Sequence, residues 1–219
     1  MSWSWAFALE ILPALLDGLI VTVKVTLISS VFALVVGLSF AIAKASRVTW
    51  VRHPVLLATE GIRRTPLLVQ LYFLFYVLPD FGVLLSPLTA GIIGLGLHYA
   101  TYTSEVFRAG IESVPVGQWE AATATNLSPY HTWTHIILPQ ALPPMIPALG
   151  NYVIAMFKET PILSAITILD LMGEALAQAN FNYRYLEPIT LVALGFLIVS
   201  LCSAAIIKIL EARLRLENG

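Results

Sequence analysis

Residues 189–209 read ITLVALGFLIVSLCSAAIIKI, a run in which Lys208 is the one charged residue. A stretch of about 20 mainly apolar residues is long enough to cross the hydrocarbon core of a bilayer as a helix. Working outward from this run, the sequence holds four more apolar stretches of spanning length. We therefore expect an all-α, polytopic membrane protein with five transmembrane helices, the others lying at about 18–43, 55–78, 84–107 and 142–171.

The composition agrees with a membrane protein. Of the 219 residues, 58% are hydrophobic and 11% are charged, whereas a soluble domain carries about 25% charged residues. This excludes a disordered chain, a basic nucleic-acid-binding domain and a typical cytosolic enzyme, and it makes membrane lipid the expected surroundings. The net charge of −1 implies no nucleic-acid partner. The single cysteine, Cys202, excludes an intrachain disulfide.

The basic residues predict the orientation of the chain. The N-terminal segment carries Glu10 and Asp17 but no basic residue before them, so it is not a cleavable signal peptide. On the side of the membrane that carries the N-terminus and Asp80, the one basic residue is Arg184. Because positive charge stays cytoplasmic, we expect a periplasmic N-terminus and a cytoplasmic C-terminus in a bacterial inner membrane. The residues that set this orientation are Lys44, Arg47, Arg52, Arg108, Lys208, Arg213 and Arg215.

Residues 109–141 then form one long cytoplasmic loop within a single membrane domain that covers residues 1–219. Connections of this length tend to be functional. The pattern predicts two short amphipathic helices, at 118–127 and 130–138, separated by a break at Ser128-Pro129 and ended by Pro139. In the first helix, Trp119 and Ala122 share one face.

Polar and ionisable residues inside the apolar stretches are the main functional signal. An unpaired charge there costs at least a few kcal/mol, so such groups face a bundle interior, a cavity or a partner. One interpretation is internal ion pairing and ring packing that fix the helices. The other is a polar path for a charged or zwitterionic solute. The candidate residues for that path are His98, Tyr102, Ser104, Glu105, Asn151, Lys158 and Glu159.

The sequence gives no sign of an enzyme. It contains no phosphate-binding loop, because no glycine is followed by lysine, so the chain does not hydrolyse ATP by itself. No Ser-His-Asp pattern with supporting context suggests a catalytic residue. His131 and His135 are four residues apart but lack the further ligands of a metal site. No cofactor is expected in this chain. An ion-driven secondary transporter would predict inverted repeats, and none is evident.

The long loop resembles the EAA loop of binding-protein-dependent ABC importers. The matching residues are Glu120-Ala121-Ala122 and, further on, Ile136-Ile137-Leu138-Pro139. Asn126 stands where the family motif has glycine, and both residue types tolerate a left-handed backbone. The resemblance implies a type I ABC importer fold and an ATPase that docks on the loop. The expected coupling residues are Glu120, Ala121, Ala122, Asn126, Leu127 and Ser128.

Further motifs are similar to those of the polar amino acid permease family: residues 64–70 (RTPLLVQ), 105–111 (EVFRAGI) and 158–160 (KET). Where this family often has Asn-Ser-Gly-Ala-Tyr, the chain has His98-Tyr99-Ala100-Thr101-Tyr102, which favours the ectoine and hydroxyectoine uptake branch. The resemblance implies import of a polar amino acid or such a compatible solute. The implied partners are a second permease subunit, two ATPases that use ATP and Mg²⁺, and an extracytoplasmic solute-binding protein.

Overall fold

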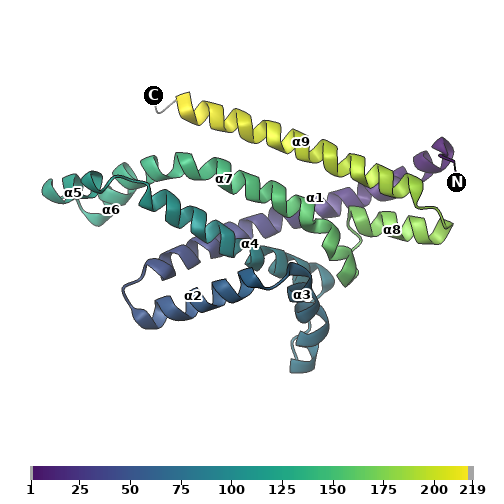
Figure 1. Ribbon diagram of the computed structural model, residues 1–219, viewed down its shortest axis with the longest axis horizontal. Coiled ribbons are helices and arrows are strands. Elements are labelled where there is room, and N and C mark those ends of the chain that lie inside the picture. Colours follow the sequence, from purple (N-terminus) through teal and green to yellow (C-terminus); the bar gives the residue numbers. More distant parts are fainter. Residues whose placement is uncertain (1, 217–219) are drawn as a thin grey trace.

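The computed structural model describes the backbone of residues 2–216 and the side chains of residues 2–212. The described chain is helical throughout, without a β-strand. Figure 1 shows its helices lying mostly along one long axis. They are α1 (Trp5–Ala45), α2 (Thr49–Arg64), α3 (Leu67–Tyr72), the π-helix η1 (Phe73–Val77), the 3-10 helix η2 (Leu78–Phe81), α4 (Pro87–Glu112), α5 (Val116–Ala124), α6 (Pro129–His131), the π-helix η3 (Thr132–Ile137), α7 (Leu138–Glu159), the 3-10 helix η4 (Thr160–Ile166), α8 (Leu171–Asn182) and α9 (Leu186–Leu216).

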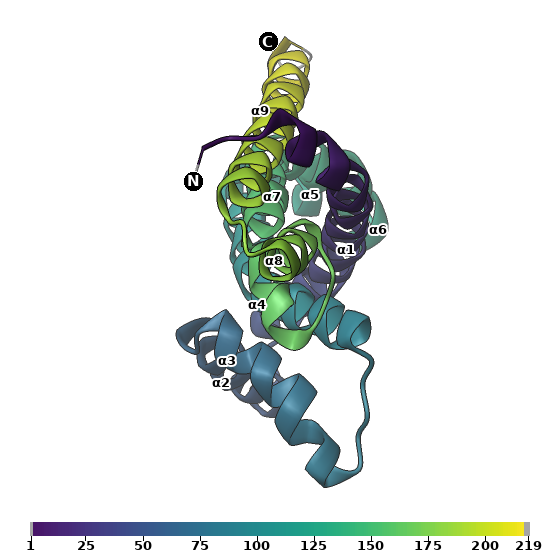
Figure 2. The ribbon, with the colours of Figure 1, turned by 90° about the vertical axis from the view of Figure 1, so that its right-hand side faces the viewer.

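Helices α1 and α4 form the centre of the molecule. In both views α2 and α3 lie on the opposite side of this pair from α9 (Figure 1 and Figure 2). The two central helices approach closely because glycine stands at their contact. A Cβ atom on Gly37 of α1 would overlap the Thr103 hydroxyl and lie 3.0 Å from the Ala100 carbonyl oxygen of α4. Small residues permit this kind of packing between membrane helices.

Replacing Gly37 by valine should therefore destabilise the bundle. The added side chain has no room between α1 and α4, and overpacking of this kind costs about 1–3 kcal/mol. The expected result is a lower unfolding temperature of the detergent-solubilised chain. Gly61→Val on α2 is the matched control, since a Cβ there meets no atom within 4 Å. Equal unfolding temperatures for the two variants would contradict this packing.

The predicted count of five spans is not confirmed. By length and apolarity, the described residues contain two helices able to cross a membrane, α1 and the Leu186–Ala212 part of α9. A third is added if Pro129–Ile166 and Leu171–Asn182, bent by 46°, form one span. The predicted stretch 84–107 falls mainly in α4. This helix contains too many polar residues to count among the helices that are apolar enough to cross a membrane.

The predicted continuous span 55–78 is wrong. The helix ends at Arg64, Thr65 is extended with ψ 133°, and α3 begins after Pro66. The reason is local, because the residue before proline is disfavoured in the helical region. This break brings the end of α2 and the start of α3 against α4, where the candidate site lies. The stretch 142–171 likewise divides into α7 and η4 and reaches the start of α8.

The expectation that Pro139 ends a second short loop helix is also wrong. Helical backbone runs from Pro129 through η3 into α7 and on to Ile166. The turn before the proline is π-helical, with the Leu138 N–H bonded to the Trp133 carbonyl. Such local adjustment lets a helix tolerate the missing N–H of proline. The second loop helix is therefore the beginning of the long α7 rod.

The connections between the helices gather at two ends of the molecule. Figure 1 shows the α1–α2 connection, α5, α6 and the C-terminal end of α9 at one end of the molecule, and the N-terminus and α8 at the other. The segments expected to be cytoplasmic thus lie together. Arg213 and Arg215 lie outside the residues whose side chains are described.

Candidate functional site

A cleft of about 650 Å³ opens beside the break between α2 and α3. Its volume falls in the usual range for small-ligand sites, about 300–1,000 Å³. We call it the polar cavity, because ionisable side chains from both α2 and α7 line it. Its lining residues are Arg63, Arg64, Thr65, Pro66, Leu67, Leu68, His98, Tyr102, Lys158, Glu159, Pro161 and Ile162.

The helix ends explain how charges come to be here. Arg63 and Arg64 occupy the last turn of α2 and Lys158 the last turn of α7, where the partial negative charge of free carbonyl groups favours cations. Glu159 adds one carboxylate to the same cavity. Cations and an anion within one cleft can bind the carboxylate and the ammonium of one zwitterionic molecule.

Lys158 and Glu159 do not pair with each other. Both side chains are exposed, and neither forms a salt bridge with a described residue. Of the two interpretations of the charges in the apolar stretches, internal ion pairing therefore does not apply to these two positions among the described residues. The reason is geometric, since neighbouring residues on a helix point in different directions. Instead, both line the polar cavity, and the Glu159 carboxylate interacts with the hydroxyl of Tyr99.

A partly buried ion pair joins Lys44 to Glu105. The Lys44 ammonium, 5% exposed, lies 2.9 Å from the Glu105 carboxylate, which also contacts Arg63 at 3.4 Å and Arg108 at 2.9 Å. Ser104 accepts a further hydrogen bond from Lys44 at 3.0 Å. Ser104 and Glu105, two predicted path residues, thus belong to this network between α1, α2 and α4, which we call the Lys44 network.

Arg63 links the Lys44 network to the polar cavity. Its guanidinium donates to the Thr101 carbonyl at 2.8 Å and lies 5.5 Å from the centre of the Tyr102 ring. Its Nε is buried without a hydrogen-bond partner among the described residues. A side chain that contacts both the network and the cavity wall can respond to a charge bound in the cavity.

The aromatic residues of α4 divide between packing and cavity. Tyr99 is 4% exposed and belongs to the central core, as the packing interpretation predicts. Tyr102 lines the cavity, with ring centres 5.3 Å from His98 and 5.7 Å from Tyr152 of α7. Asn151, in contrast, is exposed on α7 and is not part of the cavity wall.

The predicted coupling residues surround the end of α5. Asn126 has φ 54°, so its backbone is left-handed as expected for a residue replacing glycine. Its N–H bonds the Thr123 carbonyl at 3.0 Å, and the Leu127 N–H bonds the Ala122 carbonyl at 3.0 Å, which is a Schellman helix end. Ser128 then caps the next helix by accepting from the His131 N–H at 3.3 Å.

The two alanines of the loop motif face opposite ways. Ala122 is 2% exposed and lies on the face of α5 that also carries Trp119. Trp119 packs edge-on against Trp133 at 5.3 Å. Ala121 and Glu120 are exposed, as are Asn126, Leu127 and Ser128. The surface available to a partner is therefore formed by Glu120, Ala121 and the turn 126–128, and Ala122 attaches the helix to its own chain.

Sequence reasoning left three residues out of the site. Arg63 was recognisable as a charge in an apolar stretch, but its position in the cavity wall depends on the break after α2. Lys44 counts as a loop charge in the sequence, whereas the last turn of α1 buries it. Gln70, inside the stretch 64–70, contacts His98 across the break. No sequence period signals that contact.

The chain is similar in sequence to known membrane permeases. Residues 33–216 match the family described as binding-protein-dependent transport system inner membrane component. The chain is 42% identical to a probable amino-acid ABC transporter permease of Sinorhizobium fredii, over 95% of this chain and 90% of the relative. It is 38% identical to the L-cystine transport system permease of Bacillus subtilis, over 74% and 70% of the two chains.

Two solved structures of ABC transporters share the fold of this chain. A crystal structure of an amino acid ABC transporter with histidines superposes with a TM-score of 0.91 at 33% identity, covering 97% of this chain and 100% of that chain. A methionine ABC transporter in an inward-facing conformation shares the fold, with a TM-score of 0.72 at 18% identity over 94% and 97%. The chain has the all-helical fold of type I ABC importer permeases, and it belongs to the family of binding-protein-dependent transport system inner membrane components.

Proposed function

We propose that this chain is the permease subunit of an ATP-driven importer that carries a polar amino acid through the polar cavity. The observation that carries the proposal is the arrangement of charge in that cavity. Arg63 and Lys158 can bind a carboxylate while Glu159 binds an ammonium group. The printed names of the relatives, which include amino-acid, cystine and glutamine permeases, support the same substrate class.

The chain contributes transport and no covalent chemistry. A separate ATPase, present in two copies, uses ATP and Mg²⁺, and the loop 109–141 receives its motion. The whole of 1–219 then acts as one membrane domain that rocks between two states and opens the cavity to alternate sides. We place the N-terminus in the periplasm and the C-terminus in the cytoplasm, where the basic ends of α1 and α9 lie with the loop.

The importer also needs a second permease subunit and an extracytoplasmic solute-binding protein. Two probable amino-acid permeases of Sinorhizobium fredii resemble this chain, at 42% and 36% identity. This supports both a copy and a paralogue as the second permease. Membrane lipid covers the remaining apolar helix faces.

Ectoine and hydroxyectoine form the second solute class to be tested. They also combine a carboxylate with a delocalised positive charge, and His98 stands in the cavity wall where the resembling family commonly has asparagine. Competition of amino acids, ectoine and hydroxyectoine for uptake into proteoliposomes distinguishes the two classes. No observation favours an ion-driven secondary transporter.

Removing the cavity charges should weaken solute binding without loss of the fold. Lys158→Met and Glu159→Gln each delete one charge from an exposed side chain, so assembly should be unchanged. A hydrogen bond to a charged group contributes about 1.5–3 kcal/mol, so the KM for uptake should rise about tenfold or more. The measurement is ATP-dependent uptake by the reconstituted complex as a function of solute concentration.

Asn151→Ala is the matched control for these variants, because Asn151 is exposed on the same helix but outside the cavity. It should keep the KM of the unchanged chain. If Lys158→Met and Glu159→Gln also keep that KM, the polar cavity is not the solute site.

A further inference from the structure

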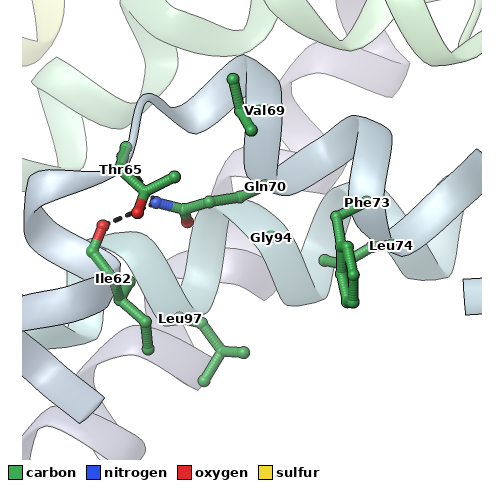
Figure 3. A pocket seen from close by; sticks show the side chains of 8 residues that line it. All are labelled: Ile62, Thr65, Val69, Gln70, Phe73, Leu74, Gly94 and Leu97. Atoms are coloured by element: carbon green, nitrogen blue, oxygen red, sulfur yellow. Dashed lines mark hydrogen bonds between the residues drawn. The ribbon is translucent and has the colours of Figure 1, made fainter. Parts of the chain in front are cut away.

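The end of the Gln70 side chain lies where only a hydrogen-bond donor fits, because acceptor oxygens surround it. Its amide nitrogen lies 2.7 Å from the Ile62 carbonyl oxygen and 2.8 Å from the Thr65 carbonyl oxygen. Figure 3 shows the nitrogen end of this side chain turned toward these two residues. Both carbonyls are at the end of α2, where the regular helix hydrogen bonds stop; the Ile62 oxygen also accepts the Thr65 N–H at 3.2 Å, and Pro66 has no N–H to offer. The orientation of the amide is thereby fixed.

The same nitrogen lies 3.1 Å from Nδ1 of His98. The two amide hydrogens face three acceptors, so one hydrogen is shared between two of them, and the amide nitrogen itself accepts no hydrogen bond. Nδ1 must therefore be the accepting nitrogen, and a proton there would face the amide hydrogens. In neutral imidazole the proton then resides on Nε2. The partner of one ring nitrogen thus sets the state of the other.

The second ring nitrogen is left for a ligand. His98 is 9% exposed and forms part of the polar cavity wall. Nε2 has no hydrogen-bond partner among the residues with described side chains. It is also not one of the fully buried atoms without a partner, so a ligand can reach it. A neutral donor therefore remains in a cavity where the other polar groups from α2 and α7 are charged.

We propose that Gln70 holds His98 as the neutral Nε2–H tautomer and that this N–H donates to an acceptor oxygen of the transported amino acid. The inference rests on the proposed function. Gln70 is a positioning residue, since it acts through His98. It couples the break between α2 and α3 to solute selection, because the same amide bonds the end of α2 and the ring.

Other charged and titratable groups surround the ring. Tyr99 and Tyr102 come from α4 itself, with ring centres 5.7 and 5.3 Å away. Arg63 of α2 lies over Tyr102, and Lys158 and Glu159 of α7 share the cavity. Gln70 is the group in direct contact with Nδ1, and its donor character opposes protonation there.

The test measures directly which nitrogen of the His98 ring carries a proton. Nitrogen NMR of the reconstituted complex, with labelled histidine in this chain, distinguishes a bare from a protonated Nδ1, and loss of the signal in His98→Asn assigns it. In the unchanged protein at about pH 7 we expect His98 to have a bare Nδ1 and a protonated Nε2. A protonated Nδ1 in the unchanged protein overturns the proposal.

A second arm removes the donor. Gln70→Met keeps the length of the side chain but has no N–H, so the Nδ1–H tautomer of His98 should become populated and the KM for uptake should rise about tenfold. Gln178→Met on α8 is the control and should leave both readouts unchanged. An unaltered His98 spectrum and an unchanged KM in a folded Gln70→Met complex contradict the proposal. If Gln70→Met does not fold, the spectrum of the unchanged protein decides.

The two proposals fail separately. A complex that takes up no amino acid in the presence of ATP contradicts the proposed function, whatever the spectrum shows. A complex that transports normally but carries a protonated Nδ1 on His98 contradicts this inference alone.

Discussion

Replacing Glu105 by alanine is expected to destabilise the chain by about 3 kcal/mol or more. The Lys44 ammonium is 5% exposed and would lose its one carboxylate partner among the described residues, and stranding a buried charge in this way costs about 3–5 kcal/mol. Arg63 and Arg108 would lose a contact as well. The measurement is the unfolding temperature and yield of the detergent-purified permease.

The control separates a stranded charge from the loss of a side chain. Glu60→Ala removes a carboxylate that is 45% exposed and lies 3.0 Å from Arg64 and 3.4 Å from Arg63, and exposed pairs of this kind contribute about 0–1 kcal/mol. The double variant Lys44→Met with Glu105→Ala removes both charges of the pair, the buried Lys44 included, and should recover much of the lost stability. If Glu105→Ala is as stable as Glu60→Ala, the Lys44 network is solvated and does not hold α1, α2 and α4 together.

Replacing Ala121 by tryptophan should abolish coupling to the ATPase. Ala121 is exposed on α5 next to Glu120, and a large ring there would prevent another protein from approaching the helix closely. Because the fold of the spans does not depend on this exposed side chain, the permease should still insert and purify. The expected result is loss of ATPase co-purification and of solute-stimulated ATP hydrolysis in proteoliposomes.

The matched control is Ala177→Trp, an exposed alanine on α8 at the other end of the molecule (Figure 1). It should retain the bound ATPase. The buried Ala122 is not suitable for this test, because a tryptophan there would disturb the packing of Trp119 and its neighbours instead of an interface. Ala121→Trp with full binding and full stimulation would show that α5 is not the docking element.

Local chemistry made much of the fold predictable. The apolar stretch 189–209 is found in α9, and the left-handed backbone of Asn126 follows from its place in the loop motif. Two prolines show the limit of such reasoning. Pro66 breaks a stretch that composition alone reads as one span, whereas Pro139 does not break its helix because the π-helical turn before it absorbs the defect.

The site was less predictable because it depends on contacts between distant segments. His98, Tyr102, Lys158 and Glu159 line the polar cavity, whereas Ser104 and Glu105 belong to the Lys44 network further along α4. A helix period tells which residues share a face, and does not tell which neighbour covers it. The buried Lys44 ammonium is paired with the carboxylate of Glu105, which lies 61 positions further along the chain.

A reconstituted complex tests the central claim most directly. The chain, its second permease, the ATPase and the solute-binding protein are placed in proteoliposomes, and uptake of labelled amino acid is measured with ATP, without ATP, and with an imposed ion gradient alone. The account predicts uptake that requires ATP and the binding protein and that the ion gradient does not drive. Uptake driven by the ion gradient in the absence of ATP would contradict it.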